Sequence, residues 1–249
     1  MSGTLYENQG LMLINPIYSQ RNWRAYFELL AAHRDKYMKN TEFPQLKDTV
    51  RAVGYMYDRT FNKTGDMTEA EWTASRDTWT TARHVGAFYI AGAYHPCLTS
   101  SSSWRPTMQF ITRYSSFLWD ESIRLMDKPW EKITVISNRE VWWEEAVYTK
   151  EKASYRDTII HLLNCPETET VDIKVTEDPP SARDVEIEME LTEKKGQVKV
   201  WVMMPYDYTD EVREPKSAQI TPKKSGNKII FRIPPFTYSS MVVIREEKI

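Results

Sequence analysis

The chain has 249 residues, 41% of them hydrophobic, and a formal net charge of -2. This length holds one large domain or two modest ones, and the lack of a basic excess or an arginine-rich stripe argues against nucleic acid as a partner. No window approaches the roughly 18–20 consecutive apolar residues of a membrane span, so we expect no membrane association either.

The first half of the chain alternates short apolar runs with helical stretches. Leu11–Ile14 is a continuous apolar run, which predicts a strand buried on both faces. Residues 22–33 predict an amphipathic helix after this strand. The apolar face of the predicted helix consists of Trp23, Phe27, Leu30 and Ala31. Thr49–Tyr57 predicts the second strand.

Two further strand–helix units follow this strand. Thr68–Glu71 has the pattern of a capping box, a threonine with an acid three residues later, and predicts a helix that runs to about Arg83. Val85–Gly92 predicts a third strand, and a serine-rich loop separates it from a helix over residues 105–126. Strands and helices in alternation predict a parallel α/β layer, here without any internal sequence repeat.

The second half is a succession of short strand patterns. Apolar runs separated by turn signals cover Ile133–Ile136, Val141–Val147, Tyr155–Leu163, Val171–Val175, Val185–Leu191, Val198–Met204, Lys228–Ile233 and Tyr238–Ile244. This pattern is typical of an antiparallel β-sandwich of the Greek-key or jelly-roll kind. Residues 193–196 predict a hairpin turn, so we expect the glutamates of Val185–Leu191 to face the lysines of the following strand.

Three stretches of the sequence resemble one enzyme family. Val85–Pro96, with the helix that contains Ile111–Asp120, resembles the last strand and helix of the catalytic barrel in dextranase-type glycoside hydrolases of family 66. Arg156–Asn164 ends in the order hydrophobic–His–Leu–hydrophobic–Asn, which is similar to the strand that opens the C-terminal β-domain of those enzymes. Ile233–Ile244 resembles the final hairpin of that domain.

The resemblance implies both a fold and a function. The fold is α/β plus all-β: the last units of a (β/α)8-type barrel in residues 1–130, then a C-terminal antiparallel β-sandwich in residues 131–249. The implied activity is hydrolysis of an α-glucan-like polysaccharide. A complete barrel takes about 200–250 residues or more, so the strands expected to carry the main catalytic carboxylates are absent. We therefore expect this chain alone to be inactive.

Four residues are candidates for contacts with a sugar. Asp58 comes just past an apolar strand, where barrel active sites are built, and is either a catalytic or sugar contact or a loop acid that caps a turn. Tyr94 and His95 follow the third predicted strand and either bind sugar hydroxyls or satisfy a buried loop. Trp104 either stacks on a sugar or packs onto the helix that follows it.

Metal and cofactor chemistry find no support in the sequence. His33, His84 and His161 are isolated, and no metal-ligand spacing, GxSxG, P-loop or GxGxxG motif occurs. Cys97 and Cys165 lie far apart in the sequence and favour buried free thiols over a disulfide. We expect neither a metal ion nor a cofactor.

Three interpretations of the function stay open at this point. The first is the glycoside hydrolase part described above, the second is a non-enzymatic carbohydrate-binding or interaction module with tryptophans as its platform, and the third is a structural protein with no affinity for sugars. The first two imply an oligosaccharide or polysaccharide partner. An incomplete barrel exposes strand edges and apolar helix faces, so we also expect the missing barrel half or a second copy as a partner. The start lacks the features of a signal peptide, but a chain that begins inside a domain would have lost them, so no compartment is assigned.

Overall fold

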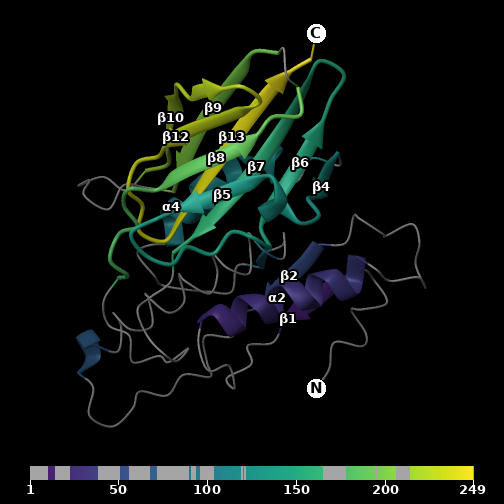
Figure 1. The fold of residues 1–249 in the computed structure, drawn as a ribbon. Helices are drawn as coiled ribbons and strands as arrows, with labels where there is room; N and C mark the ends of the chain where they lie inside the picture. Colours follow the sequence, from purple (N-terminus) through teal and green to yellow (C-terminus); the bar gives the residue numbers. More distant parts are fainter. Residues whose placement is uncertain are drawn as a thin grey trace. The chain divides into compact units, whose positions relative to one another are not determined.

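The structure is a computed structural model, and it forms two compact units. One comprises residues 1–105 with 165–179, and the other comprises residues 106–164 with 180–249. The residues that the structure describes are 11–14, 23–38, 51–55, 68–71, 90, 94–95, 104–118, 120, 122–164, 178–193, 196–205 and 214–248. Figure 1 shows the elements of each unit along the chain.

The first unit contains a three-stranded parallel sheet. Its strands are β1 (Leu11–Ile14), β2 (Arg51–Tyr55) and β3 (Tyr94–His95), in the order β1-β2-β3. β1 pairs with β2 and β2 pairs with β3, both in parallel. The predicted parallel pairing and the first two predicted strands are therefore confirmed. Gly54 is opposite both Ile14 and Tyr94, so the carboxyl ends of the three strands lie at one edge of the sheet.

The helix between the first two strands is α2 (Trp23–Met38), which runs further than the sequence pattern predicts. The predicted apolar face is confirmed for Phe27, Leu30 and Ala31, all of which are buried. Arg34 is also buried, and its Nη1 atom donates a hydrogen bond of 2.9 Å to the carbonyl oxygen of Ile90. This bond satisfies part of a buried charge, which would otherwise be costly.

The predicted capping box forms. The Thr68 backbone N–H donates to Glu71 Oε2 at 2.8 Å, and the Glu71 backbone N–H donates to Thr68 Oγ1 at 3.2 Å. Residues 69–71 are helical. Hydrogen bonding from the Thr68 backbone and hydroxyl lowers the pKa of Glu71, as expected for a carboxylate at a helix N-terminus.

The third predicted strand, Val85–Gly92, is wrong where the structure describes it. Ile90 is helical and fully buried, and the strand β3 comes later, at Tyr94–His95. A short apolar run fits a buried helix segment as well as a buried strand, because both bury all of its side chains. The other residues of this run lie outside the described residues.

The second unit, here called the two-sheet unit, consists of antiparallel strands. They are β4 (Ile123–Leu125), β5 (Ile133–Ile136), β6 (Val147–Glu151), β7 (Tyr155–Leu163), β8 (Glu186–Glu190), β9 (Val198–Met204), β10 (Lys216–Ile220), β11 (Lys223–Ser225), β12 (Lys228–Arg232) and β13 (Ser239–Glu247). The six-stranded sheet has the order β10-β9-β13-β7-β6-β4, and the four-stranded sheet has the order β11-β12-β8-β5. The antiparallel, β-rich second half is thus confirmed (Figure 1).

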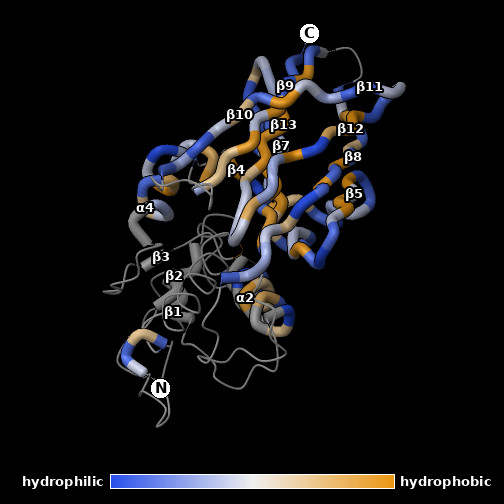
Figure 2. The backbone as a smooth tube through the Cα atoms, turned by 90° about the vertical axis from the view of Figure 1, so that its left-hand side faces the viewer, coloured by the Kyte–Doolittle hydropathy of each residue, from blue (hydrophilic) through white to orange (hydrophobic). Residues whose placement is uncertain are grey.

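An apolar core joins the two sheets. Alternate residues of each strand enter it, such as Ile160 and Val242 from the six-stranded sheet and Ile187 and Phe231 from the four-stranded sheet. In Figure 2 the hydrophobic colouring gathers on the central strands β13 and β7. This burial is the main stabilisation of the unit, at about 25 cal/mol for each Å² of apolar surface removed from water.

Two predicted hairpins are wrong. β8 pairs with β12 and β5, whereas β9 pairs with β10 and β13, so the turn after β8 crosses from one sheet to the other. The glutamates of β8 therefore meet cations on β12: Glu188 pairs with Lys228 and Glu186 pairs with Arg232. β12 and β13 likewise belong to different sheets, so within the predicted hairpin Ile233–Ile244 the residues 233–238 cross between sheets and the rest belongs to β13.

Two further predictions change in detail, and a third is not tested. The helix predicted over residues 105–126 ends early: α4 spans Trp104–Arg113, and the 3-10 turn η3 (Ser115–Phe117) and strand β4 follow it. β4 pairs with β6 and so belongs to the six-stranded sheet. In the predicted strand Val141–Val147, Trp142 makes an isolated bridge to Leu163, and β6 begins only at Val147. The predicted strand Val171–Val175 lies outside the described residues.

Candidate functional site

The four residues predicted to contact a sugar fall in or near the first unit. Tyr94 and His95 form β3 itself, at the edge where the carboxyl ends of the three parallel strands meet. They are therefore strand residues, and the prediction that they follow the third strand is corrected. Trp104 is the first residue of α4. Asp58 lies outside the described residues, so the roles of all four stay predictions.

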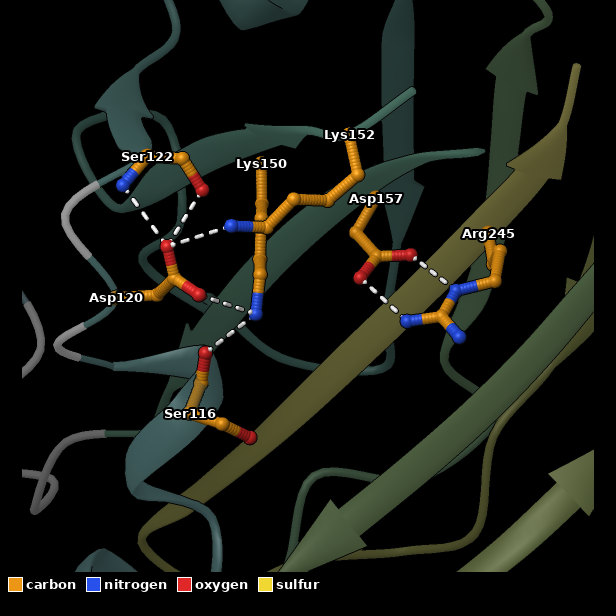
Figure 3. Close-up of polar contacts among 7 residues, drawn as sticks. All are labelled: Ser116, Asp120, Ser122, Lys150, Lys152, Asp157 and Arg245. Atoms are coloured by element: carbon orange, nitrogen blue, oxygen red, sulfur yellow. Dashed lines mark hydrogen bonds and ion pairs between the residues drawn. The ribbon is translucent and has the colours of Figure 1, made fainter. Parts of the chain in front are cut away.

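The two-sheet unit contains an ionic cluster around Asp120 (Figure 3). Its Oδ1 atom accepts hydrogen bonds from the backbone and hydroxyl of Ser122 at 2.9 and 2.5 Å and from Lys152 Nζ at 3.2 Å. Its Oδ2 atom lies 3.0 Å from Lys150 Nζ, which also donates to the carbonyl oxygen of Ser116 at 2.9 Å. The bonds from Ser122, followed by those from the lysines, hold the pKa of Asp120 well below its usual range.

The chemistry of the Asp120 cluster suits a structural role. A carboxylate with a depressed pKa stays ionised and is a poor proton donor at neutral pH. Lys150 is buried, and its ammonium group also lies 5.7 Å from the ring centre of Phe117. The cluster therefore fixes the η3 segment to β6, and so holds the end of α4 against the six-stranded sheet.

A second ion pair joins β7 to β13 (Figure 3). Arg245 donates to both carboxylate oxygens of Asp157, at 2.7 and 2.8 Å, and Asp157 is completely buried. The guanidinium carbon lies 3.7 Å from the ring centre of Tyr155 and 5.5 Å from that of Trp201. The hydrogen bonds to Asp157 raise the pKa of Arg245. The charges of Asp157 and Arg245 neutralise each other, so this pair stabilises the sheet and does not serve as an acid or a base.

The stretch Arg156–Asn164, which carries part of the family resemblance, serves packing. His161 is buried, its ring makes an edge-to-face contact of 5.6 Å with Tyr148, and burial lowers the pKa of His161 to about 3. Asn164 Nδ2 donates to the carbonyl oxygens of Pro180 and Thr237 at 2.9 and 2.5 Å. Asn164 thus ties the end of β7 to the segments that precede β8 and β13.

The sequence did not single out these charged pairs. Lys150, Asp157 and Arg245 are charged residues inside apolar strand patterns. A charge at such a position indicates that the side chain has a buried partner, and the sequence offered this signal alone. Within the described part of the chain, no group of three or more His, Cys, Asp or Glu side chains is arranged to hold a metal ion. No helix among the described residues has the length and apolar character to cross a membrane.

Comparison with known proteins identifies the family of the chain. The β-rich two-sheet unit is that of a glycoside hydrolase: the sequence model of glycosyl hydrolase family 66 matches residues 101–243, which include all of α4 and the greater part of the two-sheet unit. The chain belongs to glycosyl hydrolase family 66. The predicted relationship to dextranase-type enzymes is therefore confirmed. No curated protein matches the chain.

Two solved structures illustrate the similarity. A cycloisomaltooligosaccharide glucanotransferase from Paenibacillus sp., complexed with cycloisomaltoheptaose, is 16% identical with a TM-score of 0.49, and the match covers 67% of this chain and 27% of that one. Alpha-L-fucosidase isoenzyme 2 from Paenibacillus thiaminolyticus is 21% identical with a TM-score of 0.30, and the match covers 47% of this chain and 16% of that one. The chain thus matches about a quarter of the length of the glucanotransferase.

Proposed function

We propose that the chain is the C-terminal portion of a glycoside hydrolase that acts on an α-glucan-like polysaccharide. The first unit would supply the last strand–helix units of a (β/α)8-type barrel, and the two-sheet unit, which includes β4, would be its β-sandwich. The observation that carries the proposal is the family match over residues 101–243. The parallel order β1-β2-β3 and the helix α2 between β1 and β2 support a barrel origin for the first unit. The α-glucan follows from the resemblance to dextranase-type enzymes.

We expect this chain to hydrolyse no glycoside at a useful rate. Glycoside hydrolysis normally needs two carboxyl groups on either side of one bond, one of them able to donate a proton. Hydrogen bonds from Ser122 and ion pairs with Lys150 and Lys152 hold the pKa of Asp120 well below its usual range, and Asp157 forms a buried ion pair with Arg245. Glu246 has a pKa raised by burial, but it is 1% exposed and accepts a hydrogen bond from the Glu193 backbone at 2.7 Å. A substrate cannot reach it there.

Binding without hydrolysis is the expected behaviour of the predicted site. Tyr94 and His95 end a parallel strand, at the sheet edge where barrel enzymes place their binding residues. Together with Trp104 they would hold a short α-glucan weakly. The missing barrel half, or a second copy of the chain, would pair with β1 or β3, the outer strands of the three-stranded sheet.

The test measures hydrolysis and binding on the same protein. Purified full-length chain is incubated with dextran and the release of reducing ends is followed, and isomaltoheptaose binding is measured by calorimetry. We expect no release, and weak binding that Tyr94→Ala, His95→Ala and Trp104→Ala each reduce while Ile136→Ala, on β5, leaves it unchanged. Hydrolysis that Asp58→Asn abolishes would refute the inactive state and make Asp58 half of a catalytic pair. Binding unaffected by the first three variants would refute the predicted site.

A further inference from the structure

The two-sheet unit presents a tryptophan to solvent. The tryptophans that the structure describes in this unit are Trp130, Trp142, Trp143 and Trp201. Trp142 and Trp143 are buried, and Trp201 contacts Arg245. Trp130 is 53% exposed. The unit therefore uses its other described tryptophans for packing, and Trp130 needs a different explanation.

The backbone holds Trp130 in a fixed turn. Trp130 is the central residue of the 3-10 turn η4 (Pro129–Glu131), whose first residue is a buried proline with a restricted φ angle. The Glu131 N–H donates to the Lys128 carbonyl at 3.1 Å, and the Lys132 N–H donates to the Pro129 carbonyl at 3.0 Å. Because this turn is already ordered, a ligand that settles on the indole ring costs little backbone entropy.

Hydrogen-bonding side chains border the turn. Four polar residues near Trp130 in the sequence are exposed: Asp127, Lys128, Glu131 and Lys132. The Lys128 ammonium lies 3.6 Å from Glu131 Oε1, so these two side chains form an ion pair across the turn. The carbonyl of Lys132 accepts a hydrogen bond from the Glu190 backbone at 2.9 Å, which brings the end of β8 beside the turn. The carboxylate of Glu190 in turn accepts a hydrogen bond of 2.8 Å from Asn227. The turn thus has an exposed aromatic ring and exposed carboxylate and ammonium groups on neighbouring residues, and the backbone of Glu190 is bonded to its end.

This combination has the chemistry of a sugar platform. A pyranose ring has an apolar C–H face that packs on an aromatic ring, and hydroxyl groups at its rim that need donors and acceptors. We propose that Trp130 is the stacking platform of a second glucan-binding site, located on the two-sheet unit. The ligand class is a long α-glucan chain, and in this respect the proposal rests on the proposed function. Ile136, the other large exposed apolar residue described, is aliphatic and has no ring face to stack on a sugar.

Affinity electrophoresis of the full-length chain in gels that contain dextran tests the proposal. We expect dextran to retard the wild-type protein and Trp130→Ala to weaken the retardation about tenfold, because one aromatic contact is lost. Trp130→Phe should restore part of it. Ile136→Ala is the matched control, since Ile136 is 59% exposed, and it should migrate as wild type. Unchanged retardation of Trp130→Ala, or no retardation of the wild type, would overturn the proposal.

Fluorine NMR separates this proposal from the proposed function. In protein labelled with 5-fluorotryptophan, Trp130→Phe and Trp104→Phe assign two resonances. We expect dextran to shift the Trp130 resonance. A shift at Trp104 alone would overturn the second site and leave the proposed function intact. A shift at Trp130 alone would support the second site and count against the predicted site at Tyr94, His95 and Trp104.

Discussion

The buried histidine of β7 makes the stability of the two-sheet unit depend on pH. Burial lowers the pKa of His161 to about 3, from an ordinary value of 6.5. In the unfolded chain His161 regains its ordinary pKa, so between these two values the unfolded state binds more protons than the folded state. The free energy of unfolding must therefore fall as the pH drops below 6.5, and this loss is complete only near pH 3.

The size of the effect follows from the two pKa values. Each pH unit between them costs about 1.4 kcal/mol. From pH 7.5 to pH 5.0 the protonation of the unfolded chain at His161 removes about 2 kcal/mol, which is a large share of the 5–15 kcal/mol typical of a domain. We choose pH 5.0 as the lower limit because most carboxyl groups are still ionised there.

Urea denaturation of wild type and His161→Gln at both pH values measures the contribution of His161 to the free energy of unfolding. The variant will be less stable at pH 7.5 because its packing against Tyr148 changes. The informative quantity is the difference between the two pH values, which should be about 2 kcal/mol smaller in the variant than in wild type. Tyr148→Phe, which alters the same contact without removing a group that titrates in this range, should keep the wild-type difference. Equal pH dependence in wild type and His161→Gln would refute the buried, neutral histidine.

Two further predictions concern the Asp120 cluster and the extent of the two-sheet unit. Asp120→Ala leaves the buried Lys150 ammonium without its carboxylate, so we expect the free energy of unfolding in urea to fall by about 3 kcal/mol. Adding Lys150→Met to the same chain should recover part of this loss. No recovery would contradict the electrostatic cause. A chain that starts at residue 131 lacks β4, Asp120 and Ser116. In calorimetry it should therefore unfold at a lower temperature, and over a broader range, than a chain that starts at residue 104. Equal melting of the two chains would show that residues 104–130 add nothing to the stability of the fold.

Local patterns predicted the structure well where neighbouring residues decide the outcome. β1 has the predicted bounds, because a short apolar run before a proline leaves few alternatives. The apolar face of α2 is set by helical spacing alone, and the capping box of Thr68–Glu71 needs only residues within one turn. None of these features depends on what the rest of the chain does.

The hairpins failed because a turn between two strands does not reveal their partners. The turn after β8 has the length and composition of a hairpin, yet the strands it joins lie in different sheets. In a two-sheet fold, a connection that crosses between sheets and one that stays within a sheet can share the same turn residues. The prediction that the glutamates of β8 face the lysines of β9 is wrong, and the cations they meet are about forty residues away in the sequence, as the pair of Lys228 with Glu188 illustrates.

The buried ion pairs could not be predicted from the sequence for a related reason. Asp157 and Arg245 are 88 residues apart in the sequence, and neither strand alone indicates that its charge has a partner. A charge within an apolar strand predicts only that a partner exists. The candidate sugar contacts are harder still to predict, because they were inferred from their positions just after predicted strands. Since β3 lies at Tyr94–His95, these two residues form a strand and do not follow one.

The family resemblance in β7 therefore rests on residues that pack the fold. In Arg156–Asn164, the recognisable positions His161 and Asn164 pack a ring and bridge two segments of backbone, so they identify the fold of the two-sheet unit. Changing them should lower stability and leave the intrinsic affinity for glucan unchanged in the fraction that stays folded. Residues that bind sugar have the opposite requirement, since they must stay exposed. Trp130 satisfies this requirement although it lies outside the three stretches that resemble the family, which is why the structure was needed to find it.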